Sequence, residues 1–245
     1  MKKKIKNFLL KLIPSGVSNL IFYNHPQYKK FNNGFISFSQ EGEDMVLRRM
    51  YGYKQDGVYV DIGAHHPSIF SNTNYFYQAG WNGINIDALP GNKMHFDAER
   101  PRDINLELLV SENEGLTEFY LFEPSLMNTM SPQQAKENEK FDWCKPKGTV
   151  MVPSMPLGKL LDKYLSPGAK INFMSIDVEG AEMTVLRSNN WEKYIPDVLL
   201  VEILNTRIED ILKTDVHRFL TEKHYVFYAK TGNTVIYKKE GFFEF

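Results

Sequence analysis

The sequence lacks several features that would assign it to a class at once. Its 245 residues contain a single cysteine, Cys144, so no disulfide can form within the chain, which favours a reducing, cytoplasmic location. No base lies near Cys144 in the sequence, so we interpret it as an inert thiol. No apolar run is long enough to span a membrane, because Lys11 and Pro14 interrupt the most hydrophobic stretch.

An excess of charge of one sign is also missing. The 29 lysines and arginines offset 30 aspartates and glutamates, which leaves a formal net charge of −1. The chain therefore has no overall positive field to attract nucleic acid, and we expect no nucleic-acid partner. Its content of 42% hydrophobic and 24% charged residues suits one globular core.

A basic, amphipathic arm, residues 1–37, precedes the expected domain, residues 38–245. The arm has no small-residue cleavage site of the kind that ends a signal peptide. Peripheral contact with a membrane surface and packing of Phe8, Leu9 and Leu12 on the domain both suit this pattern, and both stay open. The sequence does not decide between a monomer and an oligomer.

The most informative segment is residues 58–87, VYVDIGAHHPSIFSNTNYFYQAGWNGINID. It predicts a strand ending near Asp61, a tight turn at Gly63, a helix, and a second strand that ends on Asp87. This order forms half of a nucleotide-binding α/β sheet, and the acid that ends the second strand is placed to bind the hydroxyls of a ribose.

The turn in this segment lacks two of the three glycines of a dinucleotide fingerprint. His65 and Pro67 occupy the places of the second and third glycines. A diphosphate must lie against bare backbone at the start of the helix, so it fits this turn poorly. An adenosine without phosphates fits better, which indicates S-adenosylmethionine as the cofactor.

Strands and helices alternate along the rest of the chain. We expect strands at 57–62, 83–86, 104–110, 171–176 and 197–203, helices at 72–79, 90–100, 157–165, 180–187 and 208–222, and a hairpin of 225–229 with 234–238. Ser39 is expected to cap one more helix, with Glu41, Glu43 and Asp44 in its first turn. The pattern predicts an α/β fold of the class I, Rossmann-like methyltransferase type. Its seven-stranded, mainly parallel sheet is closed by a C-terminal antiparallel hairpin and carries helices on both faces.

Residues 116–153 interrupt this alternation. Strands are expected at 117–122 and 149–152, and the polar segment between them, about residues 124–147, is long for a connection. Connections of this length are usually functional or disordered. We interpret 124–147 as a lid insertion over the site, with disorder as the alternative.

Four acids fall at the ends of predicted strands, where ligands of open α/β sheets bind: Asp61, Asp87, Asp177 and Glu202. Asp61 is expected to order the glycine turn, and Asp87 to bind the ribose. Asp177 and Glu179 are expected to face the transferable methyl group as a base or as metal ligands. The predicted cofactor-binding residues are Gln40, Asp61, Gly63, Ala64, His65, Asn72, Thr73, Asp87 and Ala88.

Two adjacent histidines, His65 and His66, follow the glycine turn. Imidazoles beside a carboxylate suit a divalent metal with open positions: Fe²⁺ or Mn²⁺ with histidine ligands, Mg²⁺ with carboxylates alone. The predicted metal ligands are thus Asp177, Glu202, His65 and His66, and the predicted catalytic residues are Asp177, Glu179 and His66. Alternatively, one histidine caps the helix and the other packs beneath the lid.

Five sequence blocks resemble the FkbM family of methyltransferases: FSQEGED (38–44), VDIGAHHP (60–67), FSNT (70–73), GINIDALP (83–90) and SIDVEGAE (175–182). Many members carry Asn and Gly after the turn, where this chain has His65, His66 and Pro67. The resemblance implies O-methylation by S-adenosylmethionine of a sugar in a bacterial surface polysaccharide, a glycolipid, a nucleotide-linked precursor or a secondary metabolite. An NAD-dependent enzyme acting on a nucleotide sugar and a non-catalytic scaffold are the alternatives.

Overall fold

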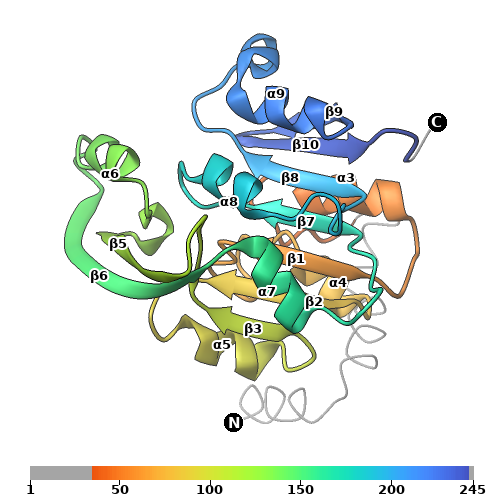
Figure 1. The fold of residues 1–245 in the computed structure, drawn as a ribbon, viewed down its shortest axis with the longest axis horizontal. Helices are drawn as coiled ribbons and strands as arrows, with labels where there is room; N and C mark the ends of the chain where they lie inside the picture. The colour runs from red at the N-terminus through yellow and green to blue at the C-terminus, as the bar shows by residue number, and fades with distance from the viewer. Residues whose placement is uncertain (1–34, 243–245) are drawn as a thin grey trace, which may run out of the picture.

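A seven-stranded sheet crosses the centre of the structure, a computed structural model that describes residues 35–242 (Figure 1). Its strands lie in the order β3-β2-β1-β7-β8-β10-β9. They span Ile104–Glu107 (β3), Asn82–Asp87 (β2), Val58–Ile62 (β1), Phe173–Ile176 (β7), Val198–Glu202 (β8), Thr234–Lys239 (β10) and Tyr225–Thr231 (β9). The first five are parallel, whereas β10 is antiparallel to both β8 and β9. This topology confirms the expected class I architecture, including the C-terminal hairpin.

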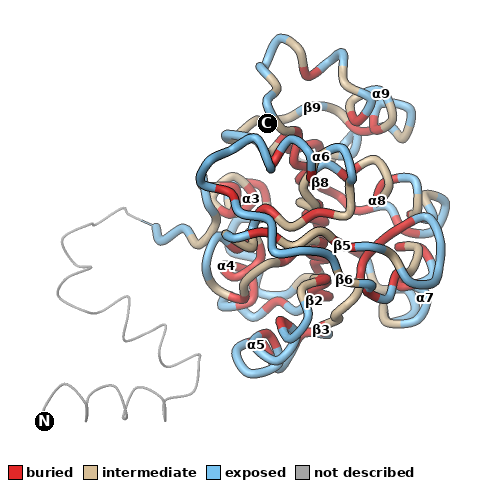
Figure 2. The backbone as a smooth tube through the Cα atoms, turned by 90° about the vertical axis from the view of Figure 1, so that its left-hand side faces the viewer, coloured by how far each residue is buried: buried red, intermediate tan, exposed pale blue. Residues whose placement is uncertain are grey.

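Helices cover both faces of this sheet. They span Glu43–Tyr51 (α3), Asn74–Gln78 (α4), Asn92–Glu99 (α5), Leu157–Tyr164 (α7), Glu182–Ser188 (α8) and Asp215–Glu222 (α9). Because side chains alternate along a strand, Val60 and Ile62 of β1 pack against α7 and α8, while Tyr59 packs against α3 and α4. Figure 2 shows the resulting buried residues in the centre of the domain and exposed residues along its outer loops.

A second sheet is built from the segment that interrupts the alternation. It has the order β4-β6-β5 and consists of Leu109–Val110 (β4), Lys145–Met155 (β6) and Gly115–Glu123 (β5). The prediction of a single strand over 104–110 is therefore wrong, because these residues form two strands, β3 and β4, in different sheets. The amide of Leu108 donates to the carbonyl of Asp87, 3.1 Å away, and beyond it the chain leaves β2 and pairs with β6.

The predicted lid segment, 124–147, has regular structure. It contains a short 3₁₀ helix, Ser125–Met127 (η1), a helix, Pro132–Asn138 (α6), and the start of β6. The Ser131 hydroxyl caps α6 by accepting from the amide of Gln134, 3.2 Å away. Figure 1 shows β5 and β6 curving away from the main sheet, with α6 near their far end.

Two predicted helices differ from the structure because of local capping. The helix expected to begin at Ser39 begins at Glu43, and the Ser39 hydroxyl donates instead to the Asp44 carboxylate, 2.8 Å away. The helix predicted for 208–222 is divided into a 3₁₀ segment, Ile208–Lys213 (η2), and α9. Thr214 separates them, since its hydroxyl caps α9 by accepting from the amide of His217.

None of the helices within residues 35–242 is long and apolar enough to cross a membrane. The predicted N-terminal arm, with its expected contacts to a membrane surface or to the domain, falls almost entirely outside the described residues.

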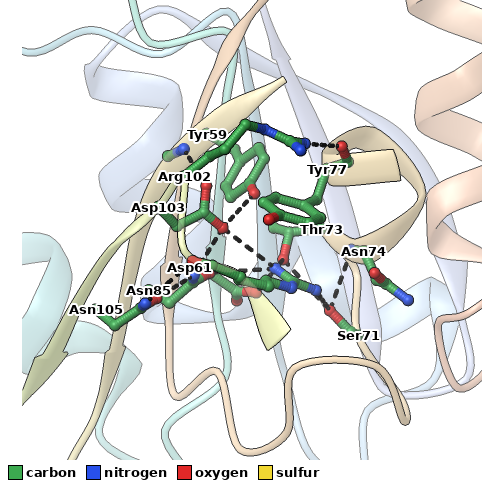
Figure 3. Close-up of polar contacts among 12 residues, drawn as sticks. Tyr59, Asp61, Ser71, Thr73, Asn74, Tyr77, Asn85, Arg102, Asp103 and Asn105 are labelled. Atoms are coloured by element: carbon green, nitrogen blue, oxygen red, sulfur yellow. Dashed lines mark hydrogen bonds and ion pairs between the residues drawn. The ribbon is translucent and has the colours of Figure 1, made fainter. Parts of the chain in front are cut away.

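A buried polar network holds the start of α4 against the sheet (Figure 3). At its centre is Arg100, 1% exposed, whose guanidinium donates to the hydroxyls of Ser71 and Thr73, both 2.7 Å away. The Thr73 hydroxyl in turn donates to the buried carboxylate of Asp61, also at 2.7 Å. Arg100 also lies 3.8 Å from Asp103, so one cation stabilises two buried acids.

Replacement of Arg100 by Met should strongly destabilise the fold, because it leaves Asp61 and Asp103 buried without their cation. We expect the free energy of unfolding, measured by urea denaturation, to fall by about 3–5 kcal/mol. Lys93→Met is the control, since Lys93 pairs with Asp97 where both side chains are nearly half exposed. It should cost less than about 1 kcal/mol, and equal losses in the two variants would contradict this role.

Candidate functional site

A pocket of about 330 Å³ lies at the carboxyl ends of β1, β2, β7 and β8, where open α/β sheets bind ligands. Most of the predicted site residues line it. They are Gln40, Asp61, Gly63, Ala64, His65, Asn72, Asp87, Ala88, Asp177, Glu179 and Glu202. Thr73 and His66 are the two predicted site residues that do not line it.

The Gly63 turn packs directly on the loop that follows β7. Gly63 has φ 80°, and a Cβ atom at this position would lie 1.6 Å from the carbonyl oxygen of Asp177. A side chain is excluded both by the backbone conformation and by this contact. The loops after β1 and β7 therefore meet, and they bring the predicted cofactor-binding and catalytic residues into one pocket.

The amides of the glycine turn already have partners. Those of Gly63 and Ala64 donate to the carbonyl of Ile86, at 2.9 and 3.1 Å, and that of His65 donates to Asp87 at 2.9 Å. The prediction that Asp61 orders this turn is therefore wrong, because its carboxylate binds Thr73 instead. Amides that are already paired offer no donors to a diphosphate, which argues against the NAD alternative.

Asp87 is arranged to accept further hydrogen bonds. One of its oxygens accepts from the amide of His65 and the other from the amide of Leu89, each at 2.9 Å. A carboxylate offers about four lone-pair sites, so each oxygen keeps a place for a ribose hydroxyl. Apolar side chains that could hold an adenine line the pocket as well: Ala88, Leu108, Leu109, Val110 and Phe119. The residues present therefore fit S-adenosylmethionine.

Among the residues at the start of α4, only Asn72 lines the pocket. Its side-chain amide donates to the hydroxyl of Ser175, 3.0 Å away. The assignment of Thr73 to cofactor binding is wrong. Thr73 is fully buried, and its hydroxyl is held between Asp61 and Arg100. Thr73 therefore stabilises the pocket wall through Asp61 and Arg100 without lining the pocket.

The two histidines have different places, and neither joins the cluster of acids. The Nδ1 atom of His66 accepts from the amides of Ser68 and Ile69, both at 3.1 Å, and His66 does not line the pocket, so the structure does not bring it to the acids as its predicted catalytic and metal-binding roles require. His65 lines the pocket with its Nε2 atom 3.4 Å from the Ser125 hydroxyl of the lid segment. The alternative, in which one histidine caps the helix, is not what the structure shows, because α4 begins at Asn74 and His66 accepts from amides of the turn before it.

Three carboxylates converge on the opposite side of the pocket. Asp177 and Glu179 follow β7, Glu202 ends β8, and one oxygen from each lies within 4.8 Å of those of the other two. Glu182 holds the loop between them, because its carboxylate accepts from the amides of Val178 and Gly180 at 3.3 and 3.0 Å.

Burial and mutual repulsion change the protonation of these acids. Burial, and then the charge of Asp177, raise the pKa of Glu179 to about 8. The same two causes raise the pKa of Glu202 to about 11, and burial raises that of Glu182 to about 7. Burial raises the pKa of Asp177 as well. Glu202 is therefore protonated at neutral pH, and Glu179 titrates in the range where a general base is effective.

These pKa values predict how stability depends on pH in a buffer with a chelator. The folded state binds more protons than the unfolded state above the ordinary glutamate pKa of 4.5, so the free energy of unfolding should fall from pH 5 to pH 8. Glu202→Gln removes one such proton, which should make the fall shallower by about 1.4 kcal/mol per pH unit. Parallel urea-denaturation profiles for the two proteins would contradict this assignment.

An exposed aromatic pair lies at the edge of the pocket. The rings of Phe141 and Trp143 stack with centroids 5.4 Å apart, although the two residues are 44% and 57% exposed, and both line the pocket. Cys144 anchors their turn in a small core, and its amide donates to the carbonyl of Phe141. Burial raises the pKa of the Cys144 thiol, in agreement with an inert cysteine. Neither aromatic residue is among the site residues predicted from the sequence, although FDWC, residues 141–144, places two aromatic side chains within the predicted lid segment.

Comparison with protein families gives one match. The Methyltransferase FkbM domain matches residues 61–227, which is more than half of the chain. The match extends from the end of β1 to β9 and includes the residues that line the pocket except Gln40 and Asn233. Among curated proteins, none matches this chain.

Solved structures with a similar fold are distant in sequence. Methyltransferase FkbM from Methylobacillus flagellatus is 13% identical with a TM-score of 0.45, over 85% of this chain and 46% of that chain. The chain thus spans about half the length of that protein. The 1,6-didemethyltoxoflavin-N1-methyltransferase from Burkholderia thailandensis, solved with 1,6-didemethyltoxoflavin and S-adenosylhomocysteine, is 10% identical with a TM-score of 0.41, over 92% of this chain and 87% of that chain.

Proposed function

The chain belongs to the FkbM methyltransferase domain family, and from that premise we propose that it methylates a sugar hydroxyl with S-adenosylmethionine. One observation carries the proposal. A single pocket joins Asp87, a ribose-binding acid in type and position, to the three carboxylates of Asp177, Glu179 and Glu202. Methyl transfer needs such a pairing of a cofactor site with groups that activate an acceptor.

The cofactor side of the pocket would hold adenosine and methionine by different means. Asp87 would accept hydrogen bonds from the two ribose hydroxyls, and the apolar side chains beside it would cover the adenine. Gln40 and Asn72 supply polar groups for the methionine part. When bound, S-adenosylmethionine supplies an electrophilic methyl group and leaves as S-adenosylhomocysteine.

The acid side of the pocket would activate the acceptor. Glu179 takes the proton of the acceptor hydroxyl as the new oxygen–carbon bond forms and the carbon–sulfur bond of the cofactor breaks. Its raised pKa suits this task, because a more basic carboxylate is a better acceptor for the proton of a weakly acidic hydroxyl. Asp177 aligns the same hydroxyl. A divalent metal held by these carboxylates would lower the pKa of the hydroxyl in addition.

The aromatic pair supports a sugar as the acceptor. The apolar C–H face of a sugar ring packs well on an aromatic ring, and Phe141 and Trp143 offer exposed rings at the pocket edge. A sugar stacked there would direct hydroxyls toward the carboxylates. The nature of the acceptor as a polysaccharide, a glycolipid or a nucleotide sugar stays open. A cytoplasmic location is part of the proposal, and the single, buried cysteine is compatible with it.

Calorimetry with S-adenosylhomocysteine and NAD tests the cofactor. We expect S-adenosylhomocysteine to bind and NAD not to bind. Asp87→Ala should weaken binding at least about tenfold, since each charge-assisted hydrogen bond to the ribose is worth about 1.5–3 kcal/mol. Asp215→Ala, a change of an exposed acid on α9, is the control and should bind normally. Preferential binding of NAD, or unchanged affinity in Asp87→Ala, would contradict the assignment.

Methyl transfer to a panel of sugars, nucleotide sugars and oligosaccharides tests the acceptor. Mass spectrometry should detect the gain of one CH₂ unit on a member of this panel. Trp143→Ala should then raise the KM for that acceptor about fivefold, since aromatic stacking is worth about 1 kcal/mol, while the affinity for S-adenosylhomocysteine stays unchanged.

Met151→Ala is the matched control for the aromatic pair, since Met151 is an exposed apolar residue of β6 that does not line the pocket. It should leave the KM unchanged. Methylation of non-sugar acceptors only, or an unchanged KM in Trp143→Ala, would contradict the sugar assignment.

A further inference from the structure

We propose that Asp177, Glu179 and Glu202 bind one divalent cation through carboxylate oxygens alone, with Mg²⁺ or Mn²⁺ as the natural occupant. Their oxygens lie within 4.8 Å of one another. Oxygens on opposite sides of an Mg²⁺ ion lie about 4 Å apart, twice the bond length of about 2.1 Å. The spacing of the three oxygens therefore accommodates an ion between them.

An unpartnered oxygen points independently to a ligand in this place. Glu202 is only 7% exposed, and its Oε2 atom is buried without a hydrogen-bond partner. Buried polar atoms in folded proteins are nearly always paired, so an orphan carboxylate oxygen requires an explanation. A cation bound between Glu202 and its two neighbours gives that oxygen a partner.

The cluster lacks an ion-pair partner among the described residues, although the charge of His65 acts to lower the pKa of Asp177 against the larger effect of burial. None of the ion pairs found within residues 35–242 involves Asp177, Glu179 or Glu202. Buried charges are generally paired or coordinate a metal. Arg100 illustrates the contrast, because it compensates Asp61 and Asp103 behind the same sheet edge. The competing way to relieve the repulsion is a shared proton, since the side chains of Asp177 and Glu202 hydrogen-bond to each other.

The ligand chemistry selects the class of ion. The oxygens of this cluster are hard ligands, which suit Mg²⁺ and Mn²⁺. The imidazole ligands that would favour iron are absent from it, since neither His65 nor His66 belongs to the cluster. This ligand set replaces the mixed set of histidines and acids predicted from the sequence.

An ion at this position would act on the acceptor. It would coordinate the oxygen of the incoming hydroxyl, lower its pKa and fix its direction toward the methyl group. This catalytic part rests on the proposed function, whereas binding of the ion can be measured without any turnover.

Titration with Mn²⁺ tests the site in the full chain after chelator treatment and dialysis. Enhancement of water proton relaxation reports bound Mn²⁺, and addition of Mg²⁺ should displace it. We expect saturable binding of one ion, weakened at least tenfold in Glu202→Gln and in Asp177→Asn. Glu209→Gln, a change of an exposed acid on η2, should bind like the unchanged protein. Circular dichroism checks that each variant is folded.

The outcomes of these experiments distinguish a failure of the proposed cation site from a failure of the proposed function. No saturable Mn²⁺ binding at millimolar concentration, or equal affinity in Glu202→Gln and Glu209→Gln, would overturn the proposed site. Binding of Mn²⁺ without methyl transfer would uphold the site and contradict the function. Full methyl transfer by a protein that binds no ion would uphold the function and overturn the site.

Discussion

The contact between the Gly63 turn and the carbonyl of Asp177 is the constraint on which the site depends. Any side chain at position 63 would overlap that oxygen, so only glycine lets the loop after β1 approach the loop after β7 this closely. The approach closes a pocket in which the acid at the end of β2 faces the acids at the ends of β7 and β8. Without it, the protein would have two half-sites on separate loops, and alignment of an acceptor with a methyl group would be lost.

Groups outside the pocket hold each of its walls. Arg100 ties the start of α4 to β1 through Thr73 and Asp61, and so positions Asn72 at the pocket wall. On the other side, the carboxylate of Glu182 fixes the loop that carries Asp177 and Glu179. The lid segment contributes as well, because the Thr129 hydroxyl donates to the carbonyl of Glu179 at 2.7 Å. These contacts hold the pocket walls in place, and Asn72 and Asp87, which line the pocket, also bond to the protein themselves.

The sequence predicts those parts of the molecule that depend on local pattern and on sheet topology. Asp87, Asp177 and Glu202 were found because parallel strands deliver their ends to one edge. Local pattern cannot report contacts between distant segments. Thr73 and His66 are predicted to belong to the site because they lie near the glycine turn in the sequence. In the structure, the Thr73 hydroxyl instead binds the distant Arg100, and His66 accepts from an amide of a local turn. Residues 104–110 are divided between two sheets because Leu109 and Val110 pair with Ser154 and Met155 of β6, a segment that is distant in the sequence.

In the proposed function, one pocket holds the cofactor against Asp87 and presents its sulfur to the carboxylates. A crystal structure of the complex with S-adenosylhomocysteine tests this most directly. The account predicts that both ribose hydroxyls donate to Asp87 and that the sulfur faces the side of the pocket formed by Asp177 and Glu179. A ribose bound away from Asp87, or a sulfur directed away from these acids, would contradict it.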